Sequence, residues 1–386
     1  MWPDPDAPGE GPLADVRILD LSRILAGPFS TQILADLGAD VIKVEREQGD
    51  ETRRWGPPFG PSGDAAYYYA CNRGKRSIVL DLREDSDREV VLELVEEADV
   101  LIENFLPGAM ERLGLSDEVL LERNPRIVHG VVSGYGQDSS RRDWPALDFV
   151  IQAYSGILAI TGPDPDTKVK AGAPIADLSA GLYLTIGILA ALRRAARTGR
   201  GERVEIALAE ASGSLLLNQA MNYLLGGIEP LALGNTHPNL VPYQVIQARD
   251  KGIALAASSE LQFQRLCRVL GLEHLIEDPR FATNPVRVAN RPELERLLEE
   301  RMAGRSAEEW VRELNEAGVA AAPINAVSEM LTDPDTQAGL VAELPDGTRA
   351  LRTPIRLGGT PLPLSSPPPS IGEHGEQIRA AMRDGR

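Results

Sequence analysis

The 386-residue sequence has few of the side chains that usually bind metals or carry redox chemistry: it contains two cysteines and four histidines. Cys71 and Cys267 lie far apart, and the histidines at positions 129, 237, 274 and 374 are equally scattered. Neither set has the spacing of a metal or redox site. We therefore expect no bound metal, and two buried free thiols in a reducing compartment.

Positive charge is also scarce. The chain carries 40 Lys and Arg against 57 Asp and Glu, which gives a formal net charge of −17 at pH 7. This excess of negative charge argues against nucleic acids and anionic membranes as main partners. The apolar run 178–192 is short for a membrane span, and the first residues lack the basic and apolar regions of a signal peptide. We expect a cytoplasmic protein.

Three common functional motifs are missing. The sequence has no G-x-S-x-G, so a hydrolase nucleophile elbow is unsupported, and it has no Walker A motif for nucleotide phosphates. The turn after the first predicted strand, 22–27, contains a single glycine. A dinucleotide-binding site is therefore poorly supported, although Glu45 ends the next predicted strand. Carboxylates remain as the candidates for covalent chemistry.

Strand and helix patterns alternate along the first half of the chain. Strands are predicted at 16–21, 40–45, 78–82, 100–105, 127–132 and 204–208, and helices between them include 27–37 and 85–98. This alternation predicts an α/β fold with a parallel sheet. Near Gly226 the pattern changes to that of a smaller α+β region. We predict a large domain over 1–220, a small domain over 221–330, and a C-terminal part over 331–386.

One carboxylate, Asp177, stands between the Gly- and Pro-containing segment 171–176 and the apolar run 178–192. The run predicts a buried helix with Asp177 at its start. Asp177 could be an N-cap that satisfies free backbone N–H groups, which is the commoner case. It could instead be a nucleophile that the helix dipole keeps ionised in an apolar pocket and that forms an acyl intermediate.

Motifs spread over nearly the whole chain are similar, in the same order, to those of the family III (CaiB/BaiF-type) CoA-transferases. The matching segments are ILDLSRILAGPF (18–29), ADLGADVIKVER (35–46), GDETRRWGPPF (49–59), NRGKRSIVLDLR (72–83), VLIENFLPGAMERLGL (100–115), SGYGQ (133–137), DLSAGLY (177–183), TGRGERVEIAL (198–208), NTHPNLVPYQ (235–244) and GEHGEQI (372–378). The resemblance implies a large Rossmann-like domain built from both chain ends, a smaller α+β domain between them, and an interlocked homodimer. It also implies that acyl-CoA and a carboxylic acid are the substrates and that no cofactor is bound permanently.

The family's functional positions fall on several of these motifs. Its nucleophilic aspartate matches Asp177. Its CoA-contacting positions match Arg46, Leu80, Arg83, Asn104, Phe105 and Arg112. Leu25 matches a position at the reaction centre that is glutamine in formyl-CoA transferases. Tyr135 lies in the glycine-containing loop 133–137, at the end of a predicted strand where α/β sheets bind ligands. We expect Leu25 and Tyr135 to face the substrate.

The reaction that the resemblance implies suits a carboxylate nucleophile. Asp177 would attack the donor thioester and form a mixed anhydride, and the released CoA thiolate would return to give an aspartyl-CoA thioester. An acceptor carboxylate would then displace CoA through a second anhydride. Water has to be excluded because it would hydrolyse the anhydrides. In this context the nucleophile is the favoured function of Asp177.

Within the family, the segments WGPPF, SGYGQ, DLSAGLY and NTHPNLVPYQ are most similar to the branch that uses succinyl-CoA and small dicarboxylates such as glutarate or hydroxymethylglutarate. We hypothesise that Arg53 or Arg54 pairs with the distal carboxylate of the acceptor, since arginine suits bidentate recognition. The alternative is that both arginines hold their loop or contact CoA phosphates.

Two other functions stay open. A 2-methylacyl-CoA racemase of the same family needs a histidine just before the aspartate that aligns with Asp148, and this chain has Leu147 there. A CoA-binding protein without turnover is the alternative from another class, and the carboxylate at position 177 argues against it.

Overall fold

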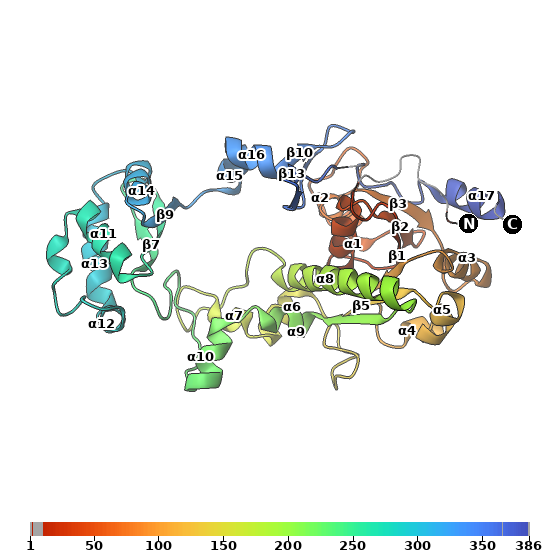
Figure 1. Ribbon diagram of the computed structural model, residues 1–386, viewed down its shortest axis with the longest axis horizontal. Helices are drawn as coiled ribbons and strands as arrows, with labels where there is room; N and C mark the ends of the chain where they lie inside the picture. The colour runs from red at the N-terminus through yellow and green to blue at the C-terminus, as the bar shows by residue number, and fades with distance from the viewer. Residues whose placement is uncertain (1, 3–10, 365, 385–386) are drawn as a thin grey trace. The chain divides into compact units, whose positions relative to one another are not determined.

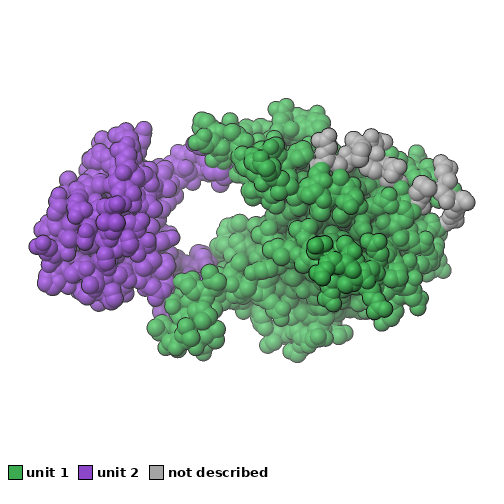
Figure 2. Space-filling view, viewed as in Figure 1, with its two compact units in different colours: residues 1–158, 170–228, 334–386 green, residues 159–169, 229–333 purple. Residues whose placement is uncertain are grey.

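The computed structural model describes residues 2, 11–364 and 366–384, and the chain divides into two compact units (Figure 2). Unit 1 comprises residues 1–158, 170–228 and 334–386, and unit 2 comprises residues 159–169 and 229–333. The predicted domain boundaries after residues 220 and 330 fall a few residues before the changes at 228 and 333. The segment 159–169, which the sequence placed in the first domain, groups with unit 2.

Unit 1 is built on a six-stranded parallel sheet in the order β3-β2-β1-β4-β5-β6 (Figure 1). The strands are β1 (Arg17–Asp20), β2 (Asp40–Glu45), β3 (Lys75–Val79), β4 (Val100–Glu103), β5 (Val128–Ser133) and β6 (Arg203–Ala207). The parallel α/β prediction is confirmed. The chain adds β2 and β3 on one side of β1 and then β4 on the other, so the strand order reverses between β1 and β4. Open α/β sheets bind ligands at such a point, beyond the carboxyl ends of the strands.

Helices cover both faces of this sheet. One face carries α1 (Ala26–Asp36), α6 (Asp148–Tyr154), α8 (Ile175–Thr198) and α9 (Leu208–Ser214), whose buried side chains share a core with Ile18 and Val128. The other face carries α3 (Asp85–Val95), α4 (Ala109–Arg112), α5 (Asp117–Arg123) and α17 (Gly375–Asp384), packed with Leu19 and Ile42. A helix from the end of the chain therefore packs on strands from its beginning.

Helix α8 lies alongside β5 in the core of unit 1 (Figure 1). By length and composition it could cross a membrane, but its buried residues Ala180, Leu184 and Ile188 pack in the core, which accounts for its apolar character. Gly181 permits a close approach to α1, because a Cβ at this position would lie 2.7 Å from the carbonyl oxygen of Ala26. The second turn of α8 and the start of α1 are thereby brought together.

Unit 2 contains an antiparallel sheet of β7 (Tyr243–Gln247), β8 (Gly252–Ala256) and β9 (Ala320–Pro323). The helices α11 (Glu260–Leu270), α12 (Asn284–Ala289), α13 (Arg291–Met302) and α14 (Ala307–Glu316) share one core with this sheet, around Phe263 and Trp310. The indole Nε1 of Trp310 donates to the Met302 carbonyl at 2.9 Å. This unit is the smaller α+β region that the sequence predicts.

The remaining elements are short. They are η1 (Glu51–Arg54), α2 (Ala66–Tyr69), α7 (Ile157–Ile160), α10 (Asn218–Gly226), η2 (Glu273–Leu275), α15 (Val327–Thr332), α16 (Pro334–Leu340), β10 (Val341–Glu343), β11 (Arg349–Leu351), β12 (Arg356–Leu357) and β13 (Thr360–Pro361).

Candidate active site

The loops that follow β1 and β4 meet where the strand order reverses. The side-chain amide of Asn104 holds the backbone of Arg23 in both directions: Oδ1 accepts from the Arg23 N–H at 2.9 Å, and Nδ2 donates to the Arg23 carbonyl at 2.7 Å. The Arg23 guanidinium lies 5.6 Å from the ring centre of Phe105 and donates to Glu51 at 2.9 Å. Contacts from separate segments therefore fix Arg23 at this junction.

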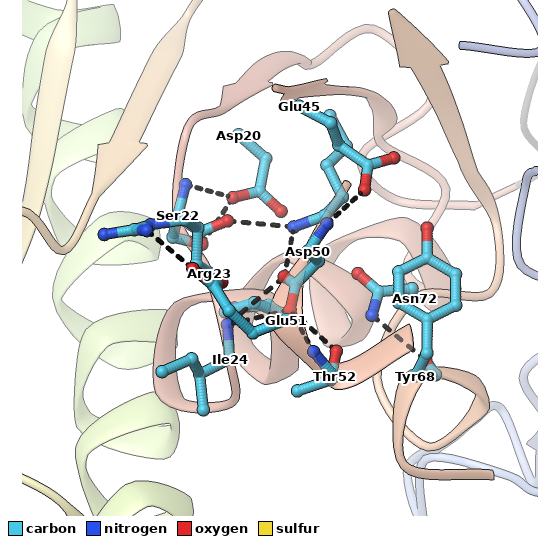
Figure 3. A network of polar contacts seen from close by, with 12 residues as sticks. Asp20, Ser22, Arg23, Ile24, Glu45, Asp50, Glu51, Thr52, Tyr68 and Asn72 are labelled. Atoms are coloured by element: carbon cyan, nitrogen blue, oxygen red, sulfur yellow. Dashed lines mark hydrogen bonds and ion pairs between the residues drawn. The ribbon is translucent and has the colours of Figure 1, made fainter. Parts of the chain in front are cut away.

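A buried network of charges supports the loop after β1 (Figure 3). The Asp20 carboxylate accepts hydrogen bonds from Ser22 N at 2.9 Å, Thr31 Oγ1 at 2.7 Å and Lys75 Nζ at 3.1 Å. Lys43 donates to the Ser22 carbonyl at 2.8 Å. Burial alone would raise the pKa of Asp20, but Lys75, Lys43 and the two hydroxyl groups lower it to about 2. Asp20 therefore stays ionised and anchors the loop.

Ile24 in this loop has a left-handed backbone, with φ of 70°. β-Branched residues rarely adopt this conformation, and such strain collects at functional sites. Asp50 stabilises it, because its carboxylate accepts from the Ile24 N–H at 3.2 Å and pairs with the buried Lys43 at 3.1 Å. The strained residue directly precedes Leu25, which lines one of the two cavities described next.

A cavity of about 720 Å³ extends along the carboxyl ends of β1, β2 and β3. Its lining includes the cations Arg23, Lys43, Arg46 and Arg83 and the apolar side chains Val79, Leu82, Phe105 and Leu113. Arg46 pairs with Glu51 at 2.6 Å, and Arg83 pairs with Asp81 at 2.6 Å, both at exposed positions. Exposed ion pairs contribute little stability, so both guanidinium groups can exchange their partners for an anionic ligand.

The six positions predicted to contact CoA are unevenly placed around this cavity. Three of them line it: Arg46, Arg83 and Phe105. Asn104 lines the adjoining smaller cavity. Leu80 lines neither cavity, because its side chain is buried in the core and its backbone N–H donates to the Glu45 carbonyl at 2.9 Å. Arg112 lines neither cavity.

The smaller cavity, of about 140 Å³, shares Arg23 and Phe105 with the larger one and is lined by Asp177. Its wall is mixed in polarity, and its apolar residues include Leu25, Ala26, Leu106, Val132, Ala146, Leu147 and Leu208. Among the described residues, the charged side chains in this wall are Arg23, Arg142 and Asp177. The two cavities therefore adjoin at Arg23 and Phe105.

Asp177 is the third residue of α8, and Pro174 takes the N-cap position, so the N-cap alternative is wrong. The Asp177 carboxylate has no hydrogen-bond partner among the described residues. Burial and the nearby Asp148 carboxylate raise the pKa of Asp177 to about 7. With this pKa the Asp177 carboxyl group is partly protonated at neutral pH, whereas the hypothesis from the sequence is that the helix dipole keeps it ionised. Burial and, to a smaller extent, the negative charge of Asp177 raise the pKa of Tyr67 to about 12, so the Tyr67 hydroxyl stays protonated.

The capping role belongs to Asp148, the first residue of α6. Its Oδ1 accepts from the Ala176 N–H at 2.9 Å, and its Oδ2 accepts from Gln152 Nε2 at 2.7 Å. Gln152 in turn accepts from the Ala171 N–H at 2.9 Å, which fixes the approach to α8. No local sequence pattern indicates this contact, because Asp148 and Ala176 are 28 residues apart.

Arg53 supports its own loop. Its buried guanidinium donates to Glu45 at 2.9 and 2.6 Å, to Asp64 at 2.9 Å and to the Tyr68 hydroxyl at 2.6 Å. These contacts agree with the alternative in which Arg53 holds the loop, and they leave it no free donor face for a substrate carboxylate. Arg54 is exposed and lines neither cavity.

The two positions expected to face the substrate differ in placement. Leu25 lines the smaller cavity, beside Asp177. Tyr135 is buried and lines neither cavity, because its ring packs edge-on against Trp144 at 5.9 Å and Tyr154 at 5.1 Å. Tyr135 therefore supports the wall from behind.

Comparisons with known proteins identify the family of the chain. The sequence profile of CoA-transferase family III matches residues 13–375. The chain is 42% identical over 382 residues to a succinate–glutarate CoA-transferase of Agrobacterium fabrum, with 96% of both chains covered. It is 36% identical to the human succinyl-CoA:glutarate CoA-transferase, covering 98% of this chain and 88% of the human one. The crystal structure of a CaiB/BaiF family protein from Brucella suis superposes with a TM-score of 0.87 at 45% identity, covering 96% of this chain and 99% of that one. The chain belongs to CoA-transferase family III, as its motifs predicted.

Proposed function

We propose that this CoA-transferase moves CoA from an acyl-CoA thioester to a small dicarboxylic acid through covalent intermediates on Asp177. One observation carries the proposal. A buried carboxylate, without a hydrogen-bond partner in the described part of the chain, lines a small cavity that shares wall residues with a larger, cation-lined one. The names of the Agrobacterium and human relatives, which contain succinate, succinyl-CoA and glutarate, support the substrate class.

The proposed reaction exchanges one carboxylic acid for another on CoA. An Asp177 oxygen attacks the thioester carbonyl, the C–S bond breaks, and a mixed anhydride and CoA thiolate form. The thiolate attacks the aspartyl carbonyl of the anhydride, which releases the donor acid and leaves an aspartyl-CoA thioester. The acceptor carboxylate displaces this thiolate, and the thiolate then attacks the acceptor carbonyl and frees Asp177. Each step joins groups of similar reactivity, so no single barrier is large.

We propose that each cavity binds a different part of the acyl-CoA substrate. In our proposal Arg46 and Arg83 bind the phosphates of CoA in the larger cavity, as guanidinium groups bind phosphates well. We also propose that the Leu80 backbone and Arg112 contact CoA. The acyl end passes Phe105 into the smaller cavity, whose apolar side chains exclude the water that would hydrolyse an anhydride.

A dicarboxylate that reacts through one carboxylate needs a cation for the other. Of the arginines in the smaller cavity, Arg23 is held by Glu51 and Phe105, whereas Arg142 has a 3.8 Å ion pair with the exposed Asp143. We therefore assign the distal carboxylate to Arg142 in place of Arg53 or Arg54. The neighbouring Arg141 stacks at 5.3 Å from the Trp144 ring and does not line the cavity, so it provides a matched control.

Incubation with succinyl-CoA and a panel of carboxylic acids tests this function, with the CoA thioesters separated by chromatography. We expect transfer to small dicarboxylates such as glutarate. The Arg142→Gln variant should raise the KM for dicarboxylates about 10- to 100-fold, the value of one charge-assisted contact, and should leave monocarboxylate acceptors unaffected. Arg141→Gln should behave as wild type. Equal losses with both acceptor classes would contradict the role of Arg142.

The same assay separates the alternatives. Among the described residues that line the smaller cavity there is no histidine, and Leu147 stands where a racemase needs one. This favours transfer over racemisation. Exchange of the α-proton of a 2-methylacyl-CoA in deuterated water, without transfer to any acid, would instead assign racemase activity. CoA binding without either reaction would leave the non-catalytic alternative.

The raised pKa of Asp177 predicts a pH-dependent rate. The nucleophile must be ionised, and its pKa of about 7 means that the active form is lost as the pH falls. We expect kcat/KM for acyl-CoA to decrease about tenfold per pH unit below pH 7. Asp148→Asn removes a neighbouring negative charge but keeps the oxygen that caps α8, so its profile should shift to lower pH. A flat profile between pH 5 and 8, or an unshifted midpoint in the variant, would contradict this electrostatic account.

We further propose that the protein works as the interlocked homodimer that its family resemblance implies. Large apolar side chains on α8 and α10 support this, with Ile186 63%, Leu224 71% and Leu225 82% exposed. Exposed apolar groups of this size commonly mark protein interfaces. Sedimentation equilibrium should give twice the chain mass of 41.7 kDa, and a monomer at micromolar concentration would refute the dimer.

A further inference from the structure

We infer that Arg23 is a catalytic residue, whose Nε–H group binds the oxyanion formed when Asp177 attacks the thioester carbonyl. This inference rests on the proposed function and adds a residue that the motif comparison did not assign.

The first observation is an unused hydrogen-bond donor. The Arg23 side chain is 36% exposed, and its Nη1 donates to Glu51 at 2.9 Å. Its Nε atom, however, is buried and has no hydrogen-bond partner among the described residues. A buried donor without a partner costs about 1–3 kcal/mol and is uncommon in native proteins. We therefore expect a ligand to supply the missing acceptor.

The second observation is the position of Arg23. Arg23 and Phe105 belong to the walls of both cavities, whereas Asp177 lines only the smaller one and Arg46 and Arg83 line only the larger one. A CoA thioester with its phosphates in the larger cavity and its acyl group at Asp177 must pass between them at this point. The thioester carbonyl is the acceptor in the substrate that lies nearest to the reacting carboxylate.

The third observation is the fixed geometry of the donor. The Asn104 amide grips the Arg23 backbone at 2.9 and 2.7 Å, and Asp50 holds the strained Ile24 beside it. Glu51 fixes the end of the guanidinium. A donor that is aligned before the reaction needs no reorganisation in the transition state, which is the property that makes an oxyanion hole effective.

The chemical step balances without any added reagent. An Asp177 oxygen forms a bond to the thioester carbon, and the carbonyl π electrons move to the oxygen. Arg23 donates a hydrogen bond to this oxyanion and keeps its proton. The oxyanion then restores the carbonyl, the C–S bond breaks, and CoA leaves as the thiolate. The same donor serves the last step, in which the thiolate attacks the acyl carbonyl of the second anhydride. In the two intervening steps the tetrahedral centre is the carboxyl carbon of Asp177.

Single-turnover kinetics test this role. Excess enzyme is mixed with radiolabelled succinyl-CoA without an acceptor, and the succinate released as the aspartyl-CoA thioester forms is followed by rapid chemical quench. For Arg23→Gln we expect the rate of release to fall about 10²- to 10³-fold, the usual effect of one oxyanion donor, with the Kd for free CoA little changed. Arg46→Gln is the matched control because Arg46 shares the partner Glu51 but lines only the larger cavity. It should raise the Kd for free CoA, which Arg23→Gln should not do.

Each outcome decides the question. A wild-type rate in Arg23→Gln, or a loss confined to CoA affinity as in Arg46→Gln, would overturn the catalytic role. Arg23→Lys keeps the charge without the Nε–H fork, so a recovered rate in that variant would show that charge alone matters and would overturn the role of Nε. It also provides the test if Arg23→Gln fails to fold, which circular dichroism would reveal. Wild-type enzyme that releases no succinate would instead contradict the proposed function.

Discussion

The Asp177→Ala variant should transfer CoA about 10⁴-fold or more slowly than wild type, since it lacks the atom that forms every covalent intermediate. Transfer from succinyl-CoA to glutarate, followed by chromatography, measures this loss. CoA binding should survive, because Asp177 does not line the larger cavity. Activity within about tenfold of wild type would show that Asp177 is a structural residue.

Stability measurements separate the chemical role from a packing role. Folding raises the pKa of Asp177 from 3.8 to about 7, so the penalty for ionising it is absent below pH 4 and complete above pH 7. An asparagine side chain cannot ionise, so the Asp177→Asn variant should be more stable than wild type at pH 8. The difference is at most about 4 kcal/mol, at about 1.4 kcal/mol per pKa unit, and should vanish towards pH 4. Calorimetry at the two pH values would reveal it, and a variant less stable than wild type at pH 8 would contradict the buried, unpartnered carboxylate.

The Arg53→Gln variant should lose about 3–5 kcal/mol of folding free energy, which is the usual cost of leaving a buried charge without its partner. Burial alone would raise the pKa of Glu45, but Arg53 and then Lys43 hold it below its usual value. Without Arg53, the buried Glu45 carboxylate keeps the nearby charge of Lys43 and the hydrogen bond from Ser77. It loses the two hydrogen bonds that Arg53 donates. Loop 49–59, which contributes Asp50 to the site, loses its anchor as well.

The exposed neighbour Arg54 is the control for this experiment. Arg54→Gln should change stability by less than about 0.5 kcal/mol, as is usual for exposed positions. Urea unfolding followed by circular dichroism compares the two variants. Similar stability for both, with a selective loss of dicarboxylate transfer in Arg53→Gln, would restore the hypothesis that Arg53 contacts the acceptor.

The sequence was most informative where local patterns determine structure. Alternating strands and helices predicted the parallel sheet, and the apolar run after Asp177 predicted α8. The prediction for β3 was less accurate, at 78–82 against 75–79, because Lys75 and Arg76 look like exposed residues. Both are buried, since they pair with Asp20 and Asp40 on neighbouring elements. Hydrophobic periodicity does not detect charges that are neutralised in the core.

The candidate site shows the same limit. Asp177 and Leu25 could be found from motifs, because each lies in a recognisable local pattern. Arg23 could not, because its importance arises where loops 81 residues apart in sequence meet through the Asn104 amide. Asp148 was also missed as the cap of α8, since its partner lies on another element. Long-range polar contacts, which depend on the folded chain, decided both roles.

The most direct test of the mechanism is to trap the covalent intermediate. The protein is incubated with succinyl-CoA without an acceptor, quenched with hydroxylamine, and analysed by intact and peptide mass spectrometry. Our account predicts a hydroxamate on the peptide that contains Asp177, and no modification of this peptide in the Asp177→Ala variant. Transfer activity without any modified peptide, or modification of another carboxylate that persists in the variant, would contradict Asp177 as the nucleophile.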